Sequence, residues 1–227
     1  MKNMIKVLAL VVSAPAFAAT SFVTVTGKCQ IKVIPDQASV IFTAEALEKD
    51  QQNSVKKVST QINDLTEKVK ALNLKGLVLD TSAYQVNQQK EWENNKMVDK
   101  GYRASLSLTV TSSETAKMGE VLALGSKAGI SNVGNLKNFL SIEKEQIEYL
   151  KCLDLAAANA QQKAEQLAKK LKAKVGDVLE IYESAPSEQA PTPVFSRMAM
   201  KGASDSVPVE SGEQLFTTQI QVKFSLK

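Results

Sequence analysis

The sequence predicts an α+β fold in which antiparallel sheets pack against amphipathic helices. Three observations predict it. Some segments alternate apolar and polar residues, and others repeat apolar residues every third and fourth position. A third is the order of these segments, ββαββ in the first half and αβαββ in the second. The 227 residues suit one large domain or two small ones.

The first 18 residues have the layout of a secretory signal peptide. Two lysines precede an apolar run over 7–12, and Ala16-Phe17-Ala18 forms a small-x-small cleavage site. That run is too short to span a bilayer as a helix, and no later segment approaches the ~20 apolar residues that a spanning helix needs. We expect cleavage near Ala18 and an exported mature chain, 19–227, without a transmembrane segment.

Residues 21–34 alternate between apolar and polar side chains, which predicts a half-buried strand. Pro35 and Asp36 interrupt the alternation, since proline cannot donate to a strand ladder and aspartate favours turns. The period of two then resumes from Val40 to Ala46. The chain is therefore expected to open with two strands joined by a corner.

Apolar residues between Val55 and Leu72 step by three and four, which predicts a helix with one apolar stripe. A strand is expected over 77–86, a polar hairpin connection over 87–100, and a further strand from Tyr102. The ββαββ half then ends at a candidate subdivision of the domain near residue 112.

The second half is predicted to hold a helix over 114–129, a strand over 132–142, a long helix over 144–172, and strands over 178–182 and 216–226. The apolar stripe expected on the long helix is Leu150, Leu153, Ala157, Ala160, Ala164, Leu167 and Leu171.

A long proline-rich loop is expected over 184–212. So long a stretch without periodicity is either mobile or functional. Within it Phe195, Met198 and Met200 form an unexpectedly apolar run that either docks on a partner or folds under the loop itself.

Composition excludes several classes of function. Removing two signal-peptide lysines from 28 basic residues leaves 26 against 24 acidic ones, which argues against a nucleic-acid partner. The chain has no histidine, so no Ser-His or Cys-His pair and no His-ligated metal site is available. No catalytic, cofactor-binding or metal-binding residues are assigned.

Two cysteines in an exported protein invite pairing, so a disulfide between Cys29 and Cys152 is one hypothesis. It would stabilise the fold by about 4 to 5 kcal/mol in the chain-entropy model. Helix geometry argues against it, because Cys152 lies off the stripe that contains Leu150 and Leu153, whereas Cys29 faces a core.

Candidate interaction residues are few. Cys152 and Leu155 share one side of the long helix and could mark a surface between subunits. Trp92, the single tryptophan, lies in the polar hairpin and is either a binding anchor or folded against its own sheet.

Four stretches resemble the SIMPL-domain family, the exported YggE-like proteins of bacteria. VTGKCQIKVIPDQASVIF is similar to the family's V-x-G-x-G-x-V-x-V-x-P-D-x-A-x-V start, except that Cys29 replaces the second glycine. GYRASLSLTV, ANAQQKAEQLAKKLKAKVGDVLEI and PVESGEQLFTTQIQVKFSL resemble the G-Y-x-A strand, the A-x-x-K-A-x-x-L-A helix with its following strand, and the C-terminal P-x-x-x-G-E strand.

The resemblance implies an α+β protein of the periplasm, with possible peripheral outer-membrane association, that forms ring-like or channel-like homo-oligomers. It also implies a role in tolerance of oxidative and other envelope stress, and no catalytic residues. The leading hypothesis is therefore a non-enzymatic periplasmic protein that contacts itself and envelope partners. The alternative is a periplasmic hydrolase that uses carboxylate or Ser-Lys chemistry.

Overall fold

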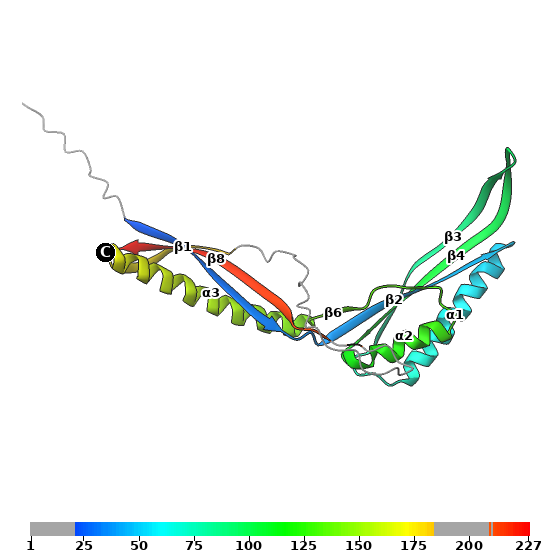
Figure 1. The fold of residues 1–227 in the computed structure, drawn as a ribbon, viewed down its shortest axis with the longest axis horizontal. Coiled ribbons are helices and arrows are strands. Elements are labelled where there is room, and N and C mark those ends of the chain that lie inside the picture. The colour runs from blue at the N-terminus through cyan, green and yellow to red at the C-terminus, as the bar shows by residue number, and fades with distance from the viewer. Residues whose placement is uncertain (1–20, 184–208, 210) are drawn as a thin grey trace, which may run out of the picture. The chain divides into compact units, whose positions relative to one another are not determined.

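The computed structural model describes residues 21–183, 209 and 211–227, and Figure 1 shows its helices and strands. It confirms the α+β class, with antiparallel strand pairs and amphipathic helices. The predicted signal peptide, and Phe195, Met198 and Met200 of the proline-rich loop, lie outside the described residues.

The described elements run in the order β1 (Phe22–Val33), β2 (Gln37–Glu48), α1 (Gln51–Ala71), β3 (Val78–Glu93), β4 (Lys96–Ser112), the short 3-10 turn η1 (Thr115–Lys117), α2 (Met118–Lys127), β5 (Asn132–Val133), β6 (Lys137–Phe139), α3 (Ile142–Lys170), β7 (Val175–Glu183) and β8 (Gln214–Leu226).

These elements form two compact units. The described part of the first unit comprises 21–28, 155–183 and 219–227, and that of the second comprises 29–154, 209 and 211–218. Three elements, β1, α3 and β8, pass from one unit into the other.

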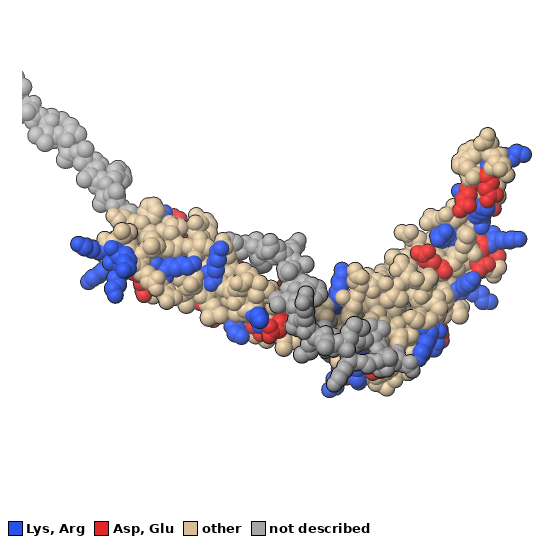
Figure 2. Space-filling view, viewed as in Figure 1, with Lys and Arg blue, Asp and Glu red and all other residues tan. Residues whose placement is uncertain are grey.

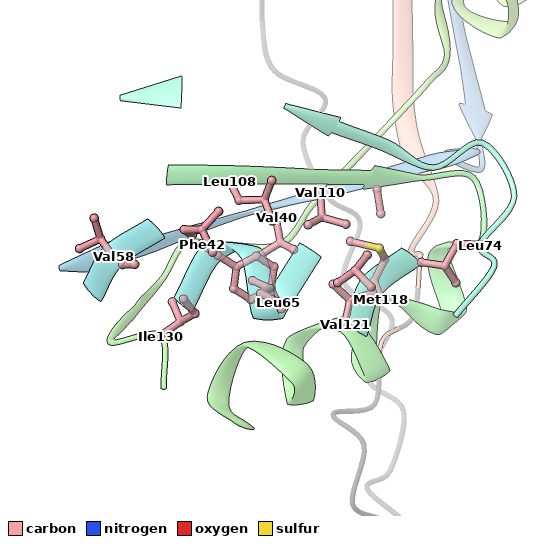
Figure 3. Close-up of a cluster of buried hydrophobic side chains, with 14 of the residues drawn as sticks. Val40, Phe42, Val58, Leu65, Leu74, Leu108, Val110, Met118, Val121 and Ile130 are labelled. Carbon is pink, nitrogen blue, oxygen red and sulfur yellow. The ribbon is translucent and has the colours of Figure 1, made fainter. Parts of the chain in front are cut away.

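The second unit is built on a sheet with the strand order β3-β4-β2-β5, and β6 pairs with another part of β2. Helices α1 and α2 cover one face of β2 and β4. Apolar residues occupy alternate positions of β2 and every third or fourth position of α1. These spacings place them all on the facing sides of the sheet and the helix, where they form the core. Figure 3 shows Phe42 and Val40 of β2 packed against Leu65 of α1 and Val121 of α2.

The predicted hairpin is confirmed, but its connection is much shorter than the predicted 87–100. Strands β3 and β4 remain paired up to Glu93 and Lys96, and only Asn94 and Asn95 form the turn. Both have positive φ, 48° and 61°, which matches the right-handed twist of two-residue hairpins and which asparagine tolerates better than most residues. A polar composition on both faces concealed these strand residues because no apolar alternation marked them.

In the first unit, α3 packs against the sheet of order β1-β8-β7 through small residues. A Cβ added to Gly27 of β1 would lie 2.0 Å from the carbonyl oxygen of Ala156 and 2.8 Å from the Cβ of Ala160. The absence of a side chain at Gly27 therefore lets the helix backbone rest directly on the strand.

The stripe predicted for α3 is correct only in part. The buried residues repeat every four positions and are Cys152, Ala156, Ala160, Ala164 and Ala168. Leu150, Leu167 and Leu171 are 53%, 47% and 77% exposed. The leucine side chains are exposed because α3 approaches β1 so closely at Gly27 that only alanine fits between them.

Candidate functional site

The structure joins Cys29 and Cys152 in a disulfide, with Cα atoms 5.4 Å apart. Both residues are buried, at 4% and 0% exposure. The geometric argument against pairing is wrong, because Cys152 begins the buried alanine series of α3 and does not lie off it. The bond fastens the end of β1 to α3 within the second unit.

The corner between β1 and β2 holds the start of α3. Asp36 accepts hydrogen bonds from the backbone N–H of Ser141 (2.8 Å) and from its hydroxyl (2.7 Å), while Lys144 Nζ donates to the carbonyl of Ile34 (2.8 Å). Burial acts to raise the pKa of Asp36, but the bonds from Ser141 and the charge of Lys144 outweigh it and lower that pKa. The corner is a structural joint.

Elsewhere in the described part of the chain, one lysine and one glutamate have shifted pKa values. A hydrogen bond to Glu93 raises the pKa of Lys100, and hydrogen bonds from Lys117 and from the backbone of Lys75 lower the pKa of Glu114. Each shift therefore arises from an ion pair or a backbone contact at the surface. Across the described residues no group of three or more acidic or cysteine side chains is arranged to hold a metal ion.

The hairpin of β3 and β4 has an exposed tip, where residues 91–97 all face solvent. No residue of β3 is buried, and Trp92 and Met97 are 71% and 54% exposed. These two residues are cross-strand partners near the tip, so they form one apolar pair on one face. Trp92 is thus not folded against the sheet that it belongs to.

Strand β3 also lies at an edge of its sheet. Among the described residues it pairs only with β4, and its 16 residues contain two register shifts, one of them at Ala83, where φ is 51°. On the other side of β4, β2 pairs only with residues 102–112, so within the described part of the chain residues 96–101 have no partner there. Long exposed edges offer unpaired N–H and C=O groups to another strand. This hairpin is the candidate interaction surface of the second unit.

In the first unit, a helix covers part of one sheet edge. Strand β1 lies at one edge of its sheet, and α3 covers part of that edge: Asn159 Oδ1 accepts from the N–H of Lys28 (3.1 Å), and Lys163 Nζ donates to the carbonyl of Thr26 (2.7 Å). Leu155, the other predicted surface residue, lies four positions before Asn159 on the same flank and is 47% exposed. No pattern in the sequence predicted this contact with the strand edge, although Asn159 and Lys163 have the i, i+4 spacing that places both side chains on one flank of the helix.

The described helices include none that is both long and apolar enough to cross a membrane. The molecule is an α+β protein of two units, and the second unit contains a disulfide and an exposed hairpin. It belongs to the SIMPL family, described as a protein of unknown function (DUF541), whose profile matches residues 23–224.

Two kinds of relative resemble the chain over most of their length. The 26 kDa periplasmic immunogenic protein of Brucella melitensis is 25% identical over 95% of this chain and 91% of its own. The uncharacterized protein YggE of Escherichia coli K12 is 21% identical over 90% of this chain and 83% of its own. The predicted family is therefore confirmed.

Proposed function

We propose that this chain is a non-enzymatic periplasmic protein that self-assembles into homo-oligomers through the β3–β4 hairpin and supports tolerance of envelope or oxidative stress. The periplasmic location is supported by the name of the Brucella relative and by the predicted signal peptide. A buried disulfide fits an oxidising compartment. Stress tolerance rests on the resemblance to exported YggE-like proteins.

One observation carries the assembly: the hairpin has a free strand edge and an exposed apolar pair, and no part of β3 is buried. An isolated two-stranded ribbon is marginally stable in water. Pairing with a second copy would add strands to the ribbon and cover Trp92 and Met97. Because all copies carry the same edge, the contact can repeat symmetrically.

The test is a hairpin truncation chosen from the register. Gln88 pairs with Tyr102, where β2 also ends, so residues 89–101 can be replaced by Asn-Gly to close a tight turn. The core residues lie outside this segment, so the variant should keep its fold. We expect native mass spectrometry and light scattering to show an oligomer for the mature chain and a monomer for the truncated one.

The matched control is Ile147→Glu, which changes a 64% exposed apolar residue on α3 and should keep the oligomer. In a strain lacking the gene, the mature chain should restore survival under peroxide and the truncation should not. A monomeric mature chain at micromolar concentration would contradict self-assembly. A truncated chain that still forms the oligomer would contradict assembly through the hairpin. If the truncated chain is monomeric and still restores full survival under peroxide, stress tolerance does not depend on assembly.

The proposal also includes envelope protein partners and peripheral association with the outer membrane. Fractionation of cells expressing the mature chain and the truncation would test both. Hydrolysis through carboxylate or Ser-Lys chemistry stays the alternative prediction from the sequence, and no contact of the described residues favours it over assembly.

A further inference from the structure

A basic groove lies in the first unit between the start of β1 and the C-terminal half of α3. Its volume is about 1050 Å³, and its lining residues are Thr24, Val25, Thr26, Lys163, Gln166, Leu167, Lys169, Lys170 and Lys172. Figure 2 shows basic side chains gathered at that end of the unit. No carboxylate belongs to the lining, so the groove has an uncompensated positive charge.

Helix geometry explains only part of this charge. Lysines in the last turn of a helix interact favourably with its macrodipole, so Lys169 and Lys170 alone would be ordinary. Among the described residues, however, none of the four groove lysines forms an ion pair within 4 Å. An acidic occupant would supply the charges that the protein itself does not.

On the strand side of the groove, no described strand pairs with the outer edge of β1. The carbonyl of Ser21 accepts a hydrogen bond from the N–H of Leu226, the last residue of β8. The carbonyl of Thr26 and the N–H of Lys28 instead bond to side chains of α3. In a strand the peptide groups of alternate residues point to the same edge. The peptide N–H and C=O of Thr24 and the N–H of Thr26 therefore point into the groove.

The edge is open over a defined length. The side chains of Lys163 and Asn159 occupy the carbonyl of Thr26 and the N–H of Lys28, so the open part runs from Phe22 to the N–H of Thr26. At ~3.3 Å per residue, this part matches an extended segment of about five residues. The half-exposed Leu167 offers apolar contact beside it, together with the lysine stems.

We propose that this groove binds an extended acidic peptide segment of a partner protein, which adds a strand to the open edge of β1 and places its carboxylates against Lys163, Lys169, Lys170 and Lys172. Main-chain pairing supplies part of the affinity, and the lysines select acidic over basic sequences. A concave groove with free peptide groups fits an extended chain better than it fits a flat lipid surface. This inference is independent of the hairpin assembly.

The probe is a fluorescent peptide of about seven residues that alternates glutamate and threonine, with blocked termini. We expect its anisotropy to rise on titration with the mature protein. Two control peptides should not bind. One has lysine in place of every glutamate, and the other keeps the glutamate and threonine sequence but has N-methylated internal amides. NMR amide shifts should change at Thr24 and Thr26 and stay unchanged along β3.

The protein variant is Lys170→Gln with Lys172→Gln, and the matched control is Lys56→Gln with Lys127→Gln. All four lysines are exposed, and both variants remove the same net charge. The groove variant should weaken peptide binding roughly tenfold and the control less than twofold, given ~0.2 to 1 kcal/mol per exposed pair.

Four outcomes would overturn the proposal. Equal binding of the N-methylated peptide would show that main-chain pairing is absent. Equal effects of the two variants would show that net charge alone is responsible. Binding of phosphatidylglycerol vesicles but not of the peptide would reassign the groove to a membrane, and a changed native mass of the groove variant would reassign it to a second copy.

Discussion

Single residues explain how the corner at the start of the second unit is held. Asp36 follows Pro35 in a position that favours a turn, and its carboxylate accepts two hydrogen bonds from Ser141 at the start of α3. Ser141 in turn accepts the N–H of Lys144 at its hydroxyl (3.3 Å), as an N-cap residue does. Asp36 thus connects two segments that are 105 residues apart in sequence.

The lowered pKa of Asp36 makes this connection dependent on pH. A carboxylate whose pKa is lower in the folded than in the unfolded chain stabilises the fold fully above its unfolded pKa, about 4, and loses that contribution as pH falls through the folded pKa. We expect Asp36→Asn to reduce the free energy of unfolding at pH 7 by about 1 to 3 kcal/mol. The difference from the unmodified chain should shrink below pH 4.

Urea unfolding at pH 7, 5 and 3 measures this difference. Asp154→Asn, at an exposed position of α3, is the control and should change stability little at any of these pH values. A deficit of Asp36→Asn that stays constant from pH 7 to pH 3 would contradict an ionised, hydrogen-bonded carboxylate at the corner.

At the scale of elements, α3 shows how small residues set a packing distance. Alanine recurs every four positions from Ala156 to Ala168, and Gly27 lies beneath two of these alanines. At 3.6 residues per turn, each step of four residues passes one full turn by about 40°, so the buried stripe winds around the helix. The leucines of the same helix consequently lie on its flanks.

A matched pair of substitutions tests this packing. Ala160→Leu places a large side chain where the Cβ is already close to Gly27, and should destabilise the first unit by about 1 to 3 kcal/mol. Ala157→Leu adds the same atoms at an exposed position of the same helix and should change stability by less than about 0.5 kcal/mol. Chemical denaturation followed by circular dichroism measures both, and equal losses would refute the close approach.

The sequence predicted the elements with strong periodicity and missed those without it. The helix over Gln51–Ala71 was expected nearly in full because its apolar residues form one stripe. The ends of β3 and β4 were missed because both of their faces meet solvent, so no alternation marks them. The stripe of α3 was misassigned because leucine is more hydrophobic than alanine, whereas fit against Gly27 decided which residues are buried.

The candidate surfaces were predictable to different degrees. Trp92 was singled out by its rarity and lies exposed in the hairpin. The groove beside β1 was not found, because it requires the strand edge and the helix flank to be placed side by side. Only the structure brings Thr24 and Thr26 next to residues some 140 positions later, such as Lys163 and Leu167.

At the scale of the whole molecule, the disulfide closes the chain of the second unit. Cys29 and Cys152 are 123 residues apart, and the main segment of that unit runs from Cys29 to Asp154. The bond thus ties together the two points where β1 and α3 leave the unit. A cross-link that closes so long a loop removes much conformational freedom from the unfolded chain.

We therefore expect the disulfide to stabilise chiefly the second unit. The unreduced, denatured mature protein should contain no titratable thiol, and two after reduction. Cys29→Ala with Cys152→Ala should lower the free energy of unfolding by about 4 to 5 kcal/mol in the loop-entropy model. Hydrogen exchange should locate the loss in β2 and α1, whose core is enclosed by the loop. Two free thiols in the unreduced protein would exclude the bond. An increase in hydrogen exchange confined to β7 would contradict the prediction that the disulfide stabilises chiefly the second unit.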